Sequence, residues 1–149
     1  MVLLDSTHQM TSLTLSHYYP GYTIPITGCA TGKAYLAHCD EHTRGEVMRN
    51  IETMDFSSHG KIKPATYDEN FWEKIREDGY ATQLNNVYSE DPGKMTSIAV
   101  PIMVGGAVVA SIAVIFFKSS LKLKEAQETF PAKLTQTAGE ISNRLEDNE

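Results

Sequence analysis

A run of 21 residues without a charged side chain constrains the fold of this chain more than any other feature. The run covers Ser97–Phe117, and its length alone would let it cross a membrane as a helix. It is interrupted by Pro101 and by the pair Gly105–Gly106, and Val, Ile, Ala and Ser dominate it. Two glycines between β-branched arms are a hairpin signal. The run therefore predicts two strands, Lys94–Val104 and Ala107–Phe117, and no membrane span.

Both arms of this hairpin are apolar on both faces, so we expect them to lie in the middle of a sheet that is covered on each side. Helices before and after a largely antiparallel sheet make an α+β domain. The other predicted elements, in chain order, are strands at Val2–Thr7 and Tyr22–Thr27, helices at Cys29–Cys39 and Thr43–Met54, a loop at Ser57–Pro64, a helix capped by Thr66 and ended by Gly79, a strand at Tyr80–Val87, and a helix at Leu121–Leu145 that Pro131 kinks or breaks.

Composition and charge exclude several classes of protein. The 149 residues are enough for one domain with a real core, and the sequence has no break that suggests a second. Thirteen basic and nineteen acidic residues give a net charge of −6, the wrong sign for a nucleic-acid surface. Two cysteines suggest neither a disulfide scaffold nor a zinc site, and no signal peptide is visible. We expect a cytoplasmic protein that does not itself bind DNA.

The stretch Thr27–Cys39, TGCATGKAYLAHC, is the strongest candidate for a binding site. A turn of small residues leads directly into a helix, and few bulky side chains obstruct its first turn. The first N–H groups of a helix lack partners within the helix and lie at the positive end of its dipole. An anion that reaches Ala30, Thr31 or Gly32 would be held by the main chain. We interpret this segment as the floor of a small-molecule pocket.

Several motifs along the chain resemble those of one known family. The sequence combines TGKAYLA (Thr31–Ala37), IREDGYA (Ile75–Ala81) and SIAVPI (Ser97–Ile102) in that order, and EIS lies in the closing helix. Together they resemble the effector-binding domain of IclR-type bacterial transcriptional regulators over Met1–Leu145. These motifs are most similar to those of the branch that activates genes for the breakdown of aromatic acids such as phenylpropionates.

The resemblance implies a GAF-like domain that binds a small organic effector and forms homodimers or tetramers. In such regulators this domain follows an N-terminal winged helix-turn-helix, which is absent from this chain and would make the contact with DNA. No cofactor, metal or enzymatic activity is implied. Carried over by position, the family's pocket falls on nine residues, including Cys29 as a wall: Cys29, Ala30, Thr31, Gly32, Gln83, Met95, Ser97, Ala113 and Ile115.

The sequence departs from the members that bind small carboxylates at three of these positions. Gln83 stands where an acidic residue is often found, and Ala113 and Ile115 stand where hydroxyl side chains occur. These changes make the pocket more apolar, which favours an aromatic carboxylate over a small polar acid.

Three other interpretations remain open from the sequence. Cys29 at a helix start is a candidate for a thiol-dependent enzyme with His38 or His42 as the base, although His38 lies nearly three turns away. His38, Cys39 and His42 form a weaker candidate metal site. Finally, the domain can be a ligand-free dimerisation module whose apolar hairpin is only core.

Overall fold

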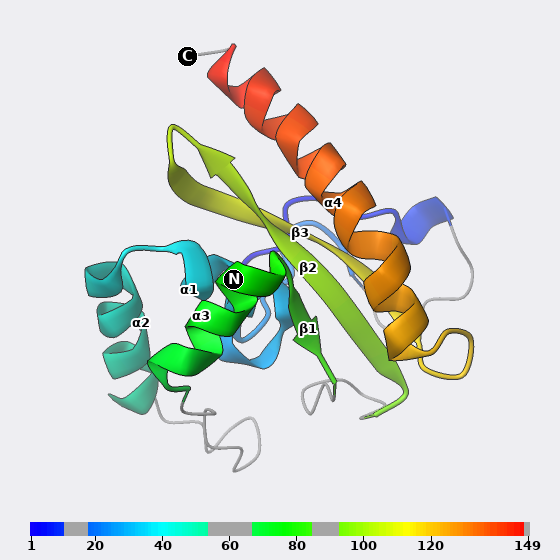
Figure 1. Ribbon diagram of the computed structural model, residues 1–149, viewed down its shortest axis with the longest axis horizontal. Helices are drawn as coiled ribbons and strands as arrows, with labels where there is room; N and C mark the ends of the chain where they lie inside the picture. Colours follow the sequence, from blue (N-terminus) through cyan, green and yellow to red (C-terminus); the bar gives the residue numbers. More distant parts are fainter. Residues whose placement is uncertain (11–17, 54–66, 85–92, 148–149) are drawn as a thin grey trace.

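The computed structural model describes residues 1–10, 18–53, 67–84 and 93–147. The loop predicted at Ser57–Pro64 and the proposed Thr66 cap lie outside these ranges. The described elements, in chain order, are the short 3₁₀ helices η1 (His8–Met10) and η2 (Ile26–Gly28), the helices α1 (Ala30–His38), α2 (Glu41–Thr53) and α3 (Glu69–Asp78), the strands β1 (Ala81–Gln83), β2 (Met95–Val104) and β3 (Ala107–Phe117), and the helix α4 (Leu123–Glu146). An α+β domain is confirmed (Figure 1).

The predicted hairpin is confirmed almost to the residue. β2 pairs with β3 in antiparallel register from Met95–Phe117 to Val104–Ala107. Gly105 has φ 55° and Gly106 has φ 81°, the left-handed pair that a primed hairpin turn requires. The Glu146 carboxylate accepts a hydrogen bond of 3.1 Å from the Gly105 amide, so the turn is held against the end of α4.

The sheet has the order β1-β2-β3 and different helices on its two faces. Ile98 and Val100 of β2 pack with α4, whereas Ala99 packs with α1 and α3. β2 is therefore central and covered on both sides, as predicted. β3 is an edge strand of this sheet, and Val109 and Ile115 are 50% and 41% exposed, so the expectation that both arms are covered is wrong for β3. Within the described residues, α4 contacts β2 far more extensively than β3, whereas α1 contacts the two strands about equally.

The first two predicted strands are much shorter than expected. Val2 and Thr23 form an isolated antiparallel bridge, and backbone hydrogen bonds join Leu3 to Tyr22 and Met1 to Ile24. The second segment then turns into η2 before α1 begins. The two segments pair as a ladder of a few residues, because the chain must curl at Ile26 to bring α1 over the sheet.

Both ends of α3 are set by local chemistry. Gly79 ends the helix with φ 76°, as predicted, and its amide returns to the Ile75 carbonyl. The cap at the start is Asp68, whose carboxylate accepts a 3.0 Å hydrogen bond from the Phe71 amide. Asp68, and not the proposed Thr66, is therefore the N-cap of α3. Glu69, which was expected to close a capping box with Thr66, instead accepts hydrogen bonds from two arginines.

Glu69 joins two arginines that cap the C-terminus of α1. Arg44 of α2 donates to the Leu36 and Cys39 carbonyls at 3.1 and 3.2 Å, and Arg76 of α3 donates to the Ala37 carbonyl at 2.8 Å. The Glu69 carboxylate accepts from both guanidinium groups, at 3.2 and 2.6 Å. This set of three charged residues, the Arg44–Glu69–Arg76 cluster, ties together three helices.

α4 runs without interruption through Pro131, so the predicted break is wrong. Leu134 and Ala138 are buried against the sheet, and this packing outweighs the lost hydrogen bond. Leu145, near the end of the helix, is 44% exposed. None of the described helices is long and apolar enough to span a membrane.

Candidate functional site

The N-terminus of α1 is capped by a thiol. Cys29 is the N-cap residue, and its Sγ accepts hydrogen bonds from the Gly32 amide at 3.3 Å and from the Thr31 hydroxyl at 3.2 Å. The amides of Ala30 and Thr31 form no hydrogen bond with the described residues. The helix start thus keeps two of the N–H groups to which an anion can bind, while the third is already used by Cys29.

Gly32 lies directly against the turn that precedes the helix. A Cβ atom on Gly32 would be 1.7 Å from the Ile26 carbonyl oxygen and 2.5 Å from its carbon. Only glycine permits this approach. The close contact between α1 and η2 fixes the direction in which the first turn points.

Five predicted residues share one face of the sheet, the face that α1 covers. Gln83, Ser97 and Ile115 are direct cross-strand neighbours on β1, β2 and β3. Met95 and Ala113 lie two residues along their strands from Ser97 and Ile115, and therefore on the same face. We call these five residues the sheet strip. Gln83, Ser97 and Met95 are at most 8% exposed. Ile115 is the most exposed residue of the strip.

Gln83 links the sheet strip to the start of α1. Its side-chain Nε2 donates to the Gly28 carbonyl, and its Oε1 accepts a 3.4 Å hydrogen bond from the Ser97 hydroxyl. The Thr96 hydroxyl donates to the Gln83 carbonyl. A glutamine amide has two N–H donors and two acceptor lone pairs, so among the described residues each end retains one position for a further partner. The nine predicted residues thus form two adjoining groups, Cys29–Gly32 and the sheet strip.

The structure also reveals two polar residues that the sequence analysis did not select. Ser111 lies two residues before Ala113 on β3, and its buried Oγ has no hydrogen-bond partner among the described residues. The sequence could have indicated Ser111, because a residue two positions from Ala113 on a strand lies on the same face. Lys33, in the first turn of α1, donates to the Thr82 carbonyl at 3.4 Å. Its spacing of four from Cys29 predicts the same helix face, but not its contact with β1.

The geometry gives little support to the enzyme and metal interpretations. The Nδ1 atom of His38 lies 2.9 Å from the Ala34 carbonyl oxygen, one turn back on its own helix, and His42 pairs with Glu46 at 3.9 Å on the surface. The Cys39 thiol donates to the Leu36 carbonyl, and burial raises its pKa. Among the residues placed by the structure, no three His, Cys, Asp or Glu side chains are grouped to hold a metal ion.

Several solved structures of transcriptional regulators are similar to this one. A transcriptional regulator from Rhodococcus sp. RHA1 matches with a TM-score of 0.71 and 16% identity over 93% of this chain and 55% of that one. The IclR protein of Thermotoga maritima gives 0.66 and 22% over 89% and 51%. The inducer-binding domain of a PobR double mutant from Acinetobacter, in complex with 3-hydroxybenzoic acid, gives 0.69 and 18% over 95% and 85%.

At these identities the solved structures establish the fold, and this chain spans about half the length of the first two. The family is established by a sequence model described as bacterial transcriptional regulator IclR C-terminal, which matches residues 1–143. This family consists of regulators and not of enzymes. The chain therefore belongs to the IclR family of bacterial transcriptional regulators, in which it corresponds to the C-terminal, effector-binding domain.

Proposed function

We propose that this domain senses an aromatic or other organic carboxylic acid, and that binding alters the affinity of the full-length regulator for DNA. The observation that carries the proposal is that the start of α1 and the sheet strip lie next to each other. The amides of Ala30 and Thr31, which form no hydrogen bond with the described residues, adjoin the sheet strip through the hydrogen bond from Gln83 to Gly28. One end of such a site suits a carboxylate, and the other suits an apolar ring.

In this proposal the ligand carboxylate binds to the amides of Ala30 and Thr31. The ring lies against Met95, Ala113 and Ile115, and Gln83 offers its remaining donor and acceptor to a ring hydroxyl. An anion at a partly buried helix start gains up to ~2 kcal/mol. Burial of a ring-sized apolar surface contributes on the order of 1.5–3 kcal/mol. Together these contributions, about 3.5–5 kcal/mol, correspond to a dissociation constant of roughly 0.2–3 mM, a range that suits a metabolite sensor.

An aromatic acid is favoured because most of the sheet strip is uncharged and apolar. Gln83 offers the ligand a neutral amide, and not a carboxylate. Ala113 and Ile115 offer no hydroxyl group to a small polar acid. The PobR domain, which shares the fold at 18% identity, was crystallised with 3-hydroxybenzoic acid, and this complex supports the same class of ligand here.

The domain would act within a larger assembly. We propose that it works in the cytoplasm as a homodimer or tetramer, joined to an N-terminal winged helix-turn-helix domain. The net charge of −6 leaves DNA binding to that other domain. Binding of the acid transmits a signal only if the acid has different affinities for two arrangements of the assembly.

Calorimetric titration of two matched variants tests the binding site. Ile115 and Val109 are both exposed residues of β3, but only Ile115 belongs to the sheet strip. The wild-type chain is titrated with 3-(3-hydroxyphenyl)propionate, 3-hydroxybenzoate, benzoate and pyruvate. We expect Ile115→Trp to weaken binding of the aromatic acids by about tenfold, because the indole occupies the place of the ring. Val109→Trp should leave the affinity unchanged.

Two results would contradict the proposal. If no acid bound to the wild-type chain, the ligand-free dimerisation module would be the better interpretation. If Ile115→Trp and Val109→Trp bound the acids with the affinity of the wild-type chain, a sensor function would remain possible, but the site would lie elsewhere.

A further inference from the structure

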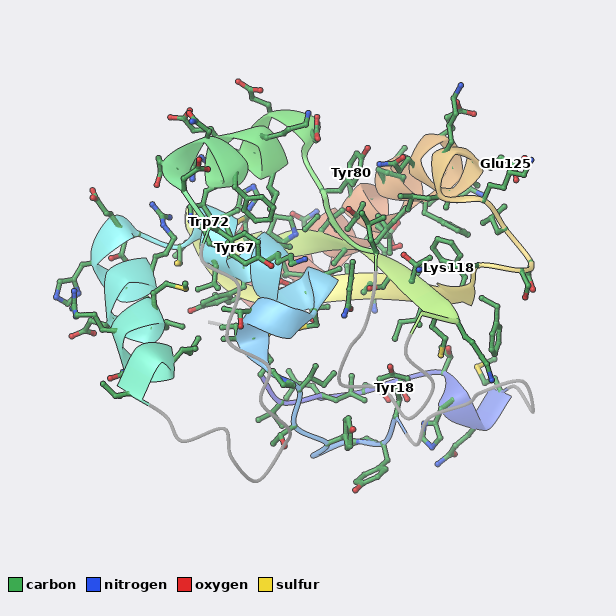
Figure 2. The ribbon with its side chains drawn as sticks, turned by 90° about the horizontal axis from the view of Figure 1, so that it is seen from below. Tyr18, Tyr67, Trp72, Tyr80, Lys118 and Glu125 are labelled. Atoms are coloured by element: carbon green, nitrogen blue, oxygen red, sulfur yellow. The ribbon has the colours of Figure 1, made fainter. Side chains whose placement is uncertain are left out.

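Lys33 occupies an unusual place for a charged side chain. It is half-buried in the first turn of α1, and its Nζ lies 5.5 Å from the ring centre of Tyr67 and 6.0 Å from that of Phe71. The two rings stack at 4.0 Å, and Tyr67 lies beside α1 in Figure 2. The hydrogen bond to Thr82 brings the ammonium to β1, next to Gln83 in sequence. Lys33 thus joins the start of α1 to the edge of the sheet strip.

No carboxylate neutralises this ammonium within the described part of the chain. The ion pairs of the neighbouring helices use other residues: Arg44 and Arg76 bind Glu69, Lys74 binds Asp78, and His42 lies near Glu46. Cations are favoured at the C-terminus of a helix, whereas Lys33 stands at the N-terminus. Burial lowers the pKa of the Lys33 ammonium, and the adjacent Cys29 acts in the opposite direction.

The contacts that Lys33 makes with the described residues leave part of its hydrogen-bonding capacity unused. An ammonium has three N–H donors, and one of them binds the Thr82 carbonyl. The faces of the aromatic rings attract the positive charge but accept no full hydrogen bond. A ligand carboxylate near the first turn of α1 would supply both the missing negative charge and the missing acceptors.

We propose that Lys33 is the residue by which this site selects a carboxylate over a neutral ligand of the same shape. The inference rests on the proposed function, because it assigns a further contact to the same ligand. The amides of Ala30 and Thr31 bind any acceptor oxygen, whether it is charged or neutral. Lys33 adds a full charge, so it distinguishes an acid from its amide.

A purely structural role for Lys33 gives a different expectation. If the ammonium only joins α1 to Tyr67 and Thr82, its removal should lower the thermal stability of the ligand-free domain and weaken all ligands alike. If Lys33 selects the carboxylate, its removal should weaken acids and leave the neutral amides unaffected. The ratio of the two affinities therefore separates the roles.

The test is a calorimetric comparison of 3-(3-hydroxyphenyl)propionate and 3-hydroxybenzoate with their primary amides. The variants are Lys33→Met, Lys33→Gln and Lys33→Arg, and Lys74→Met removes a surface charge from α3 as the matched control. We expect the wild type to prefer the acids by about tenfold or more, and both neutral variants to lose that preference. Lys33→Arg and Lys74→Met should keep most of it. Thermal unfolding without ligand confirms that each variant is folded.

Three other results would overturn the inference about Lys33. A wild-type chain that binds amides as tightly as acids would overturn the inference, even if no Lys33 variant folds. Acid binding that persists in Lys33→Met and Lys33→Gln would also overturn it, while the sensor function would stand. If the wild-type chain bound neither acids nor amides, the inference and the proposed function would both fail.

Discussion

Gly32→Ala is expected to destabilise the domain by about 3 kcal/mol in urea denaturation, as overpacking against a rigid neighbour does. The new Cβ would lie 1.7 Å from the Ile26 carbonyl oxygen. A backbone carbonyl cannot rotate away as a flexible side chain can, so η2 and the start of α1 must separate. The amides of Ala30 and Thr31 would then lose their position over the sheet strip. Acid binding should be lost together with stability.

Gly139→Ala provides the matched control. Gly139 lies in the exposed part of α4, and a Cβ there would meet no atom within 4 Å. Replacement of a glycine by alanine inside a helix without new contacts stabilises by about 1 kcal/mol. The same chemical change should therefore have opposite signs at the two positions. A Gly32→Ala variant as stable as the wild type would show that α1 does not pack on Ile26 in this way.

Arg44→Met is expected to lower the free energy of unfolding by about 2–3 kcal/mol, because hydrogen bonds to a buried charged group contribute that much. The Arg44 side chain is only 11% exposed and donates to the Leu36 and Cys39 carbonyls and to Glu69. Methionine replaces the aliphatic stem but leaves these acceptors unpaired. α2 stands apart from the sheet in Figure 1, so this contact is a principal attachment of α2. Urea denaturation with circular dichroism measures the loss.

Glu69→Gln separates the effect of charge from the loss of hydrogen bonds in the same cluster. The Glu69 side chain is 54% exposed, so a smaller loss is expected than for Arg44→Met. The hydrogen bond from Arg76, together with the charge of Arg44, holds the pKa of the Glu69 carboxyl below its ordinary value. Its contribution is complete above the ordinary glutamate range and is lost as the pH falls through the lowered pKa. Glu69→Gln should lack this acid-dependent loss; an Arg44→Met variant no weaker than Glu69→Gln would contradict the assigned role of Arg44.

The parts of the fold that the sequence predicted correctly are those set by short-range chemistry. The pair Gly105–Gly106 permits a tight primed turn, and the uncharged arms around it pair over their full length. Gly79 ends α3 because it adopts a left-handed conformation without a steric penalty. Each of these signals lies within a few residues of the feature that it specifies, so periodicity and turn residues were sufficient.

The parts that were missed depend on contacts between distant segments. Pro131 does not break α4, because packing against the sheet holds the helix together. Glu69 is part of a cluster with Arg44 from another helix, and no local pattern shows that it is needed there. The N-terminal strands are short because the chain turns at Ile26 to place α1. Long-range packing, and not propensity, decided these features.

The same distinction applies to the candidate site. The cross-strand alignment of Gln83, Ser97 and Ile115 shows that residues chosen by resemblance share one face. By contrast, the approach of Lys33 to Thr82 joins a helix to a strand 49 residues away, and the sequence gives no indication of it.

Two-dimensional ¹H–¹⁵N NMR of the 149-residue chain, titrated with 3-(3-hydroxyphenyl)propionate, tests the central claim most directly. The account predicts that the backbone signals of Ala30 and Thr31 and the side-chain amide of Gln83 shift together, with the same saturation curve. Signals from the exposed face of α4 should not move. Shifts confined to α4 or the hairpin turn, or a spectrum unchanged at millimolar acid, would contradict the account.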